Sequence, residues 1–245
     1  MMQHVLKKLV LKAIAMGIKA PEQQIDRYLE LTHLKALLEQ LEINCVLDVG
    51  ANAGQFASEL RAIGYRGHIV SFEPIPEVYR QLSDAFASDP KWTGYNVALG
   101  SETKQTSIHV HAMSVMSSLL ESTASQANAQ TQTIEVKRLD DIIDRVTDHV
   151  NEAKLFLKMD TQGYDLEVFK GGQRSILRVR GLQSELSVQP LYRGMPHYDA
   201  SLRTYEEAGF ELYNLSVVGR VPGGGLMELN ALMRRTEKPT SESES

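Results

Sequence analysis

The chain has 245 residues, a net charge of −5 at pH 7 and a single cysteine. That length suits one large domain with short additions at its ends. The negative charge argues against a general nucleic-acid binder. One cysteine excludes a disulfide framework, so the composition favours a reducing, cytoplasmic location. We find no apolar run long enough to cross a membrane.

Apolar residues recur at helical spacing between Leu6 and Gly17 and alternate with basic ones, which are Lys7, Lys8, Lys12 and Lys19. A basic amphipathic helix of this kind can lie on an anionic membrane surface. Packing on its own domain or on a second copy of the chain is the commoner arrangement, and it is the one we expect. A second predicted helix over residues 23–41 completes an N-terminal helical segment, residues 1–42.

The most informative stretch begins with an apolar strand over residues 45–49, followed by a glycine turn and a helix over residues 55–63. A second strand over residues 68–72 then ends at Glu73. This order is half of a nucleotide-binding βαβ unit, in which the start of the helix offers free N–H groups. We expect Gly50 and Gly54 to admit a ligand close to the backbone, and Glu73 to accept hydrogen bonds from two ribose hydroxyls.

The spacing of the turn also indicates which nucleotide is bound. The run lacks both the Gly-x-Gly-x-x-Gly pattern of dinucleotide folds and the Gly-Lys-Ser/Thr of a phosphate-binding loop. Asp48 stands two residues ahead of the turn, where it would repel a pyrophosphate but suit the ammonium group of S-adenosylmethionine. An NAD-dependent oxidoreductase and a non-catalytic nucleotide-binding or scaffold domain remain as alternatives.

The rest of the chain alternates between strand and helix, which predicts a mostly parallel sheet covered on both faces. Helices are expected over residues 76–87, 139–146, 166–178 and 200–208, and strands over 92–99, 155–159, 182–188, 210–215 and 229–234. Residues 105–112 and 131–138 alternate like a β-hairpin. The predicted organisation is therefore one domain over residues 43–235, with a hairpin insertion near 101–138, and a disordered tail over 236–245.

Several short motifs carry a family resemblance when they are taken in order. They are Asp48-Val-Gly-Ala-Asn-Ala-Gly-Gln-Phe56, Phe72-Glu-Pro74, Asn96-Val-Ala-Leu-Gly100, Leu139-Asp-Asp141, Lys158-Met-Asp-Thr-Gln-Gly163 and Ser184-Glu185. Together they resemble the FkbM family of S-adenosylmethionine-dependent methyltransferases. The chain departs from the family pattern at Gln162 and Asp165, where glutamate is frequent.

The resemblance implies a Rossmann-like class I methyltransferase fold, with a mostly parallel seven-stranded sheet and helices on both faces. It also implies O-methylation of a hydroxyl on a sugar, glycolipid or related secondary metabolite, as in glycan biosynthesis. Combined with the glycine-turn motif, it assigns a set of donor-binding residues. These are Asp48, Gly50, Asn52, Gly54, Phe56, Glu73, Pro74, Asn96, Ala98 and Asp160.

An alcohol acceptor loses a proton when it is methylated, so a general base is expected beside the methyl group. Asp160, at the end of a buried apolar strand, is the first candidate, and Glu185 on the neighbouring strand is the second. His197, on a Gly/Pro-containing loop, is the third. A divalent metal that acidifies the alcohol is an alternative to a base, although the sequence assigns no ligands to it.

Overall fold

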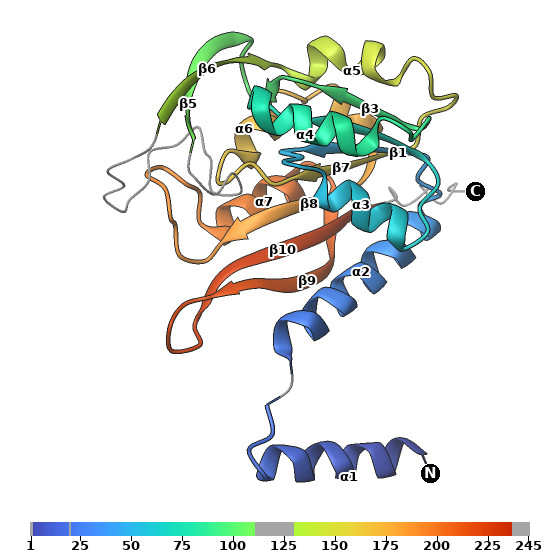
Figure 1. Cartoon of the computed structure of the whole chain (residues 1–245), viewed down its shortest axis with the longest axis vertical. Coiled ribbons are helices and arrows are strands. Elements are labelled where there is room, and N and C mark those ends of the chain that lie inside the picture. The colour runs from blue at the N-terminus through green and yellow to red at the C-terminus, as the bar shows by residue number, and fades with distance from the viewer. Residues whose placement is uncertain (1, 20, 111–129, 237–245) are drawn as a thin grey trace, which may run out of the picture.

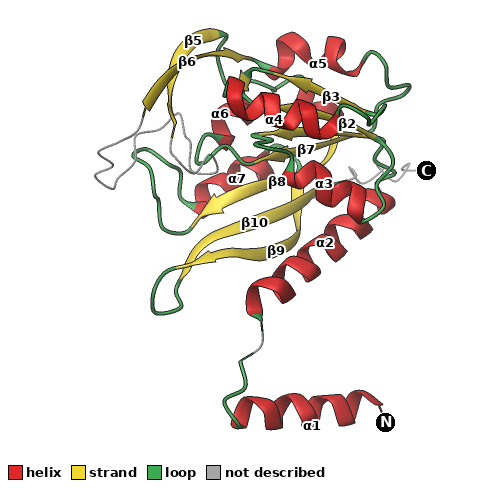
Figure 2. Ribbon diagram, in the orientation of Figure 1, coloured by secondary structure: helices red, strands yellow, loops and turns green. Residues whose placement is uncertain are grey.

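A computed structural model describes residues 2–19, 21–110 and 130–236 (Figure 1). The predicted tail beyond residue 236 and most of the segment between the two hairpin strands lie outside the described residues. The body is a central sheet with helices on both faces, as Figure 2 shows.

Seven strands form the central sheet in the order β3-β2-β1-β7-β8-β10-β9. Their bounds are β1 Cys45–Val49, β2 His68–Phe72, β3 Trp92–Tyr95, β7 Leu155–Met159, β8 Val179–Ser187, β9 Phe210–Arg220 and β10 Leu226–Arg235. β1 pairs in parallel with β2 and β7, and β7 with β8, whereas β10 runs antiparallel to both of its neighbours. The predicted fold class, a mostly parallel seven-stranded sheet, is confirmed, and β10 is its antiparallel strand.

Helices from the two halves of the chain cover opposite faces of the sheet. α2 (Glu22–Gln40), α3 (Gln55–Ala62) and α4 (Pro76–Phe86) lie on one face, and α5 (Leu139–Thr147), α6 (Asp165–Lys170) and α7 (Tyr198–Glu207) on the other. Successive side chains of β1 point to opposite faces of the sheet. Val46 therefore packs in the hydrophobic cluster beneath α2, α3 and α4, and Leu47 in the cluster beneath α5, α6 and α7. All five residues of β1 are buried, as expected for a parallel strand covered on both faces.

The strand predicted over residues 92–99 is two strands. β3 ends at Tyr95 in the central sheet, and β4 (Ala98–Leu99) joins a second sheet with β5 (Lys104–Val110) and β6 (Gln130–Lys137). The break falls at Asn96, whose Nδ2 donates to the backbone oxygens of Glu73 (2.8 Å) and Pro74 (3.0 Å). These side-chain bonds divert the backbone from the ladder at this point.

The helix predicted over residues 166–178 is interrupted. α6 ends at Lys170, and a 3₁₀ turn follows at Ser175–Arg178. Gly171 stands at the break, where an added Cβ would lie 1.9 Å from the backbone oxygen of Gly100. The end of α6 can therefore approach the second sheet only with glycine at this position.

Gly171→Ala should consequently destabilise the protein, by about 1–3 kcal/mol, because an extra methyl group in a packed interior forces a backbone shift. Gly172→Ala is the matched control, since its Cβ would meet the flexible side chain of Leu139 at 3.1 Å. Denaturant unfolding of both variants measures the difference. Equal midpoints for the two variants would contradict this reason for the break.

The first helix, α1 (Met2–Ala15), stands apart from the body and is joined to α2 by a short connection (Figure 1). Val10, Leu11 and Ile14 are 50%, 56% and 66% exposed. Within the described residues α1 therefore does not pack on its own domain, and packing on a second copy of the chain stays a prediction. The connection explains why α1 stands apart, because Gly17 has a φ of 69° and turns the chain away at the end of the helix. No helix in the described part of the chain is long and apolar enough to span a membrane.

Candidate functional site

A cavity of about 330 Å³ opens where the carboxyl ends of β1, β2, β7 and β8 meet. In doubly wound sheets this edge is the usual ligand site. Eight of the residues expected from the sequence line the cavity: Gly50, Asn52, Phe56, Glu73, Pro74, Ala98, Asp160 and Glu185. The fold thus brings together residues from five separate motifs.

The glycine turn has a different physical role from the one expected. Gly50 has a φ of 73°, and a Cβ there would lie 2.0 Å from the backbone oxygen of Asp160. At Gly54, with a φ of 92°, a Cβ would lie 2.5 Å from the ring of Phe86. The absence of a Cβ at these two glycines makes room for other atoms of the protein, and not for a ligand. Gly50 still lines the cavity through its backbone, but Gly54 does not.

Glu73 lies at the end of β2, buried and held by two backbone N–H groups. Its Oε2 accepts from the N–H of Asn52 at 3.0 Å, and its Oε1 from the N–H of Ile75 at 2.9 Å. Burial raises the pKa of Glu73 to about 7, although both N–H groups act to lower it. Each oxygen keeps a further acceptor site, so the carboxylate can bind two adjacent hydroxyls.

Two residues expected to contact the donor instead support those that can. The side-chain amide of Asn96 donates to the backbone oxygens of Glu73 and Pro74, as described above, and Asn96 does not line the cavity. Asp48 is fully buried beneath the cavity, where its Oδ1 lies 3.0 Å from Nζ of Lys158. Asp48 does contact an ammonium group, as expected, but this group belongs to Lys158 and not to the donor.

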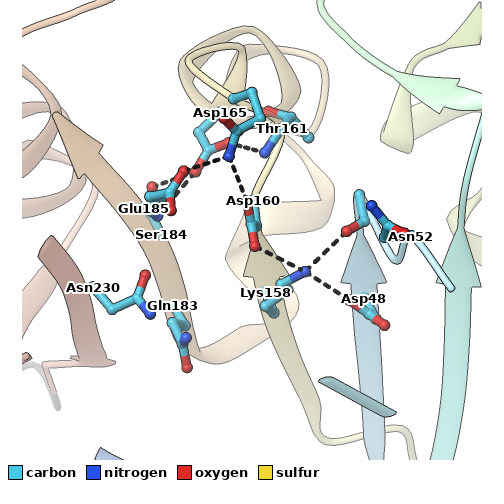
Figure 3. A network of polar contacts seen from close by, with 12 residues as sticks. Asp48, Asn52, Lys158, Asp160, Thr161, Asp165, Gln183, Ser184, Glu185 and Asn230 are labelled. Carbon is cyan, nitrogen blue, oxygen red and sulfur yellow. Dashed lines mark hydrogen bonds and ion pairs between the residues drawn. The ribbon is translucent and has the colours of Figure 1, made fainter. Parts of the chain in front are cut away.

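Lys158 lies at the centre of the polar network drawn in Figure 3. Its Nζ donates to the backbone oxygen of Gly50 at 3.1 Å and lies 3.7 Å from Oδ2 of Asp160. Burial alone would lower the pKa of Lys158, but Asp48 and Asp160 outweigh it and raise this pKa above its usual value. The lysine therefore stays charged and ties the ends of β1 and β7 together. The sequence signal was a lone lysine two residues before Asp160 in an otherwise apolar strand.

Asp160 and Glu185 are two carboxylates in different surroundings. Nε2 of Gln162 donates to Oε2 of Glu185 at 2.9 Å and reaches Oδ1 of Asp160 at 3.4 Å, so that it bridges the pair. The side chain of Asp160 is 42% exposed and faces Lys158. Burial raises the pKa of Glu185 well above its usual value, and the negative charge of Asp160 raises it further. Glu185 is thus the carboxylate whose burial favours taking up a proton.

Asp165, the acid that stands where the family pattern has glutamate, is buried away from the cavity. Its Oδ1 accepts from the N–H of Thr161 at 2.9 Å, and its Oδ2 from the hydroxyl of Ser184 at 2.7 Å. It therefore fixes the turn after β7 against β8. This arrangement positions Asp160 and Glu185 relative to each other.

The far wall of the cavity comes from residues that the sequence did not identify. Glu30 of α2 is buried, and its Oε1 accepts from Nδ2 of Asn230 at 2.7 Å and from Nε2 of Gln183 at 3.2 Å. Arg27, one turn earlier, donates to Glu30 at 2.6 Å and to Glu59 at 2.9 Å. Arg27, Glu59, Gln183 and Asn230 all line the cavity. No local pattern predicts a cluster whose members lie up to 200 positions apart.

His197 does not reach the cavity. It precedes α7, and its Nδ1 lies 2.7 Å from Oδ1 of the exposed Asp199. The expectation that this loop residue faces an acceptor in the cavity is not met, because the chain places it at the start of a surface helix.

The fold is similar to solved structures at low sequence identity. A protein of Thermobifida fusca YX, solved as a candidate methyltransferase, matches at a TM-score of 0.50 with 11% identity, covering 89% of this chain and 84% of that one. Fibrillarin of Aeropyrum pernix with bound S-adenosylmethionine matches at 0.45 with 13% identity (78% and 66%). The magnesium protoporphyrin IX methyltransferase of Synechocystis PCC 6803, also with bound S-adenosylmethionine, matches at 0.44 with 9% identity (89% and 86%).

The first of these likenesses defines the chain as a doubly wound fold of the class I methyltransferase type. A model of the methyltransferase FkbM domain matches residues 48–212, and the chain belongs to this family. It is an S-adenosylmethionine-dependent methyltransferase. The alternatives of an NAD-dependent oxidoreductase and a non-catalytic domain are overturned by this match. No curated protein matches the chain.

The charges around the cavity fit this donor, which carries a sulfonium and an ammonium group. Among the described residues that line the cavity, four are carboxylates, namely Glu59, Glu73, Asp160 and Glu185. Two are cations, Arg27 and Lys158. A divalent metal fits less well, because the described residues contain no group of three or more His, Cys, Asp or Glu side chains placed to hold one. We therefore assign no step to a metal.

Proposed function

We propose that this methyltransferase acts on a hydroxyl group of a sugar, glycolipid or related secondary metabolite. The observation that carries the proposal is Glu185, a cavity-lining carboxylate whose burial raises its pKa toward the range of an effective general base. A nitrogen or sulfur nucleophile has less need of such a group. The family resemblance, which implies sugar and metabolite hydroxyls, supports the same class of acceptor.

The donor is held, in this proposal, along the ends of β1 and β2. Glu73 accepts the two ribose hydroxyls, while the backbone of Gly50 and Asn52 contacts the sugar and the methionine end. Phe56, Pro74 and Ala98 supply apolar contacts. Asp160, beside Lys158, faces the cationic end of the donor. Support comes from the fact that all these residues line the same cavity.

The donor supplies a methyl group that is already activated for transfer. Glu185 accepts the proton of the acceptor hydroxyl as the new O–CH₃ bond forms and the S–CH₃ bond breaks, which leaves S-adenosylhomocysteine and a methyl ether. Gln162 orients Glu185 through its 2.9 Å hydrogen bond. Positioning of the two reactants supplies the rest of the acceleration, up to about 7–11 kcal/mol in well-oriented systems.

The far wall suits an acceptor with several hydroxyls. Gln183 and Asn230 present amide groups, and Arg27 and Glu59 form a charge pair in which donors and acceptors stand side by side. A polyhydroxylated ring can exchange its hydrogen bonds with water for hydrogen bonds with such groups.

We also propose a reducing, cytoplasmic setting. It is supported by the lone Cys45, which is a buried thiol whose pKa is raised by burial to about 12.

Transfer from donor labelled with ¹³C in its methyl group tests the proposal. The protein is incubated with a panel of sugars, glycolipids and hydroxylated metabolites, together with amine and thiol compounds of similar size. The carbon chemical shift of the product then distinguishes a methyl on oxygen from one on nitrogen or sulfur. We expect label only on oxygen. Label on nitrogen or sulfur would contradict the proposal.

The pKa of Glu73 predicts how donor affinity depends on pH. Because burial places this pKa near 7, the carboxyl is neutral below that pH and offers weaker acceptors to the ribose. Affinity for S-adenosylhomocysteine should therefore rise as pH increases through about 7 and level off above it. Calorimetric titration between acidic and mildly alkaline pH measures this.

Glu73→Ala is the matched control for this titration. At alkaline pH it should bind about 10-fold to 150-fold more weakly, the loss expected for hydrogen bonds to a charged group (about 1.5–3 kcal/mol). Its remaining pH dependence reports the ligand's own amino group. The same affinity and the same pH dependence in the folded variant would remove Glu73 from the donor site.

A further inference from the structure

The isolated position of α1 leaves an apolar patch that no described residue of its own chain covers. Ile14 lies three positions after Leu11 and four after Val10, so the three side chains share one side of the helix, and they are half to two-thirds exposed. Ile18, in the connection, is 59% exposed. Four large apolar side chains within nine residues are more than scattered surface residues require.

The charge of this segment is opposite to that of the body. Residues 1–19 contain four lysines and no acidic residue, in a chain whose net charge is −5, so the rest of the chain carries −9. Lys7, Lys12 and Lys19 are exposed, and none of them has an ion pair within the described residues. An exposed helix in water is usually stabilised by Glu–Lys pairs along its surface, and α1 has no acidic residue to form one.

We propose that α1 docks on anionic lipid bilayers and holds the enzyme at the membrane surface. Val10, Leu11, Ile14 and Ile18 enter the boundary between headgroups and acyl chains, while the lysines meet the anionic headgroups. The charge complementarity favours this occupant, because an anionic surface attracts the +4 segment and repels the −9 body.

Docking would also bring the cavity near the membrane. Only the connection and the first turn of α2 separate α1 from Arg27, which lines the cavity. A lipid-linked acceptor would thus meet the enzyme at the surface where it resides. This consequence rests on the proposed function, whereas membrane docking itself does not, and it is tested without turnover.

Sedimentation with vesicles tests the proposal. Vesicles of equal parts phosphatidylcholine and phosphatidylglycerol are compared with pure phosphatidylcholine, at low salt and at about 1 M salt, where the screening length is ~3 Å. We expect binding to the anionic vesicles alone, and only at low salt. Replacing Lys7, Lys8, Lys12 and Lys19 by glutamine should reduce partitioning by a factor on the order of several hundred, about fivefold per lysine.

A body variant with the same charge loss is the matched control. It carries glutamine at Lys35, Lys104, Lys154 and Lys170, each of which forms an ion pair on the body. It should bind anionic vesicles as the wild type does. A Val10→Ser, Ile14→Ser variant, which keeps every lysine, should lose on the order of tenfold. Titration with S-adenosylhomocysteine shows that each variant is folded.

Three results would overturn the proposal. The first is absence of binding to anionic vesicles at low salt. The second is equal loss of binding in the helix and body lysine variants, which would reduce the effect to overall charge. The third is a dimer in sedimentation equilibrium that disappears on deletion of residues 1–20, with no vesicle binding, because a second copy would then be the occupant of α1.

Discussion

Replacing Glu185 by glutamine should lower the turnover number by about 10²–10⁴, the range typical of a general base, while donor affinity changes far less. The substitution keeps the shape of the side chain and removes its ability to take a proton. The pH dependence supplies a second signature. Because the pKa of Glu185 is raised, activity of the wild type should already decline at a pH well above that of an ordinary carboxyl group. In Glu185→Gln that decline should be absent.

Asp160→Asn is the comparison that separates the two carboxylates. It removes a charge that faces Lys158 and, in the proposed arrangement, the donor's cationic end, so we expect a loss of donor affinity larger than its effect on the chemical step. Single-turnover rates at saturating donor isolate that step. If Asp160→Asn abolished the chemical step at unchanged affinity, and Glu185→Gln remained active, the roles of the two acids would be exchanged.

Lys158→Met should lower the free energy of unfolding by about 3–5 kcal/mol, since it leaves a buried carboxylate without its partner. Asp48 is fully buried, and Lys158 is the cation 3.0 Å from it. Denaturant unfolding of the variant and the wild type measures this loss.

A surface lysine provides the control for this stability measurement. Lys154, just before β7, forms an ion pair with the exposed Glu42 at 2.6 Å, and Lys154→Met should change the unfolding free energy very little. The double variant Lys158→Met, Asp48→Asn should recover part of the loss, because it removes both charges and leaves no unpaired carboxylate at position 48. A loss in Lys158→Met no larger than in Lys154→Met would contradict the buried pair.

The parts of the fold that the sequence predicted are those with strong local patterns. β1, β2 and β7 have the bounds expected for them, because each is a run of five mostly apolar residues delimited by loop residues. The division of the predicted strand at residue 96 was missed, since it depends on hydrogen bonds from Asn96 to a loop more than twenty positions away. The end of α6 was missed for the same reason, because it depends on the backbone of Gly100.

The candidate site divides along similar lines. Residues within motifs, such as Gly50, Glu73, Asp160 and Glu185, could be placed at one cavity because parallel strands end at a common edge. What each of them contacts could not be predicted. Asp48 forms an ion pair with Lys158, which comes from another strand. Glu30 of α2 accepts hydrogen bonds from Gln183 and Asn230, which lie near it only in the folded sheet. His197 was misplaced because a loop sequence does not specify its direction.

A crystal structure of the complex with S-adenosylhomocysteine tests the central claim most directly, namely that one cavity holds the donor between Glu73 and the pair Asp160 and Glu185. We predict that both ribose hydroxyls bond to the carboxylate of Glu73 and that the sulfur faces the cavity toward Glu185, with the amino group near Asp160. A donor bound outside this cavity would contradict the account. So would a donor turned end for end, with its adenine beside Glu185.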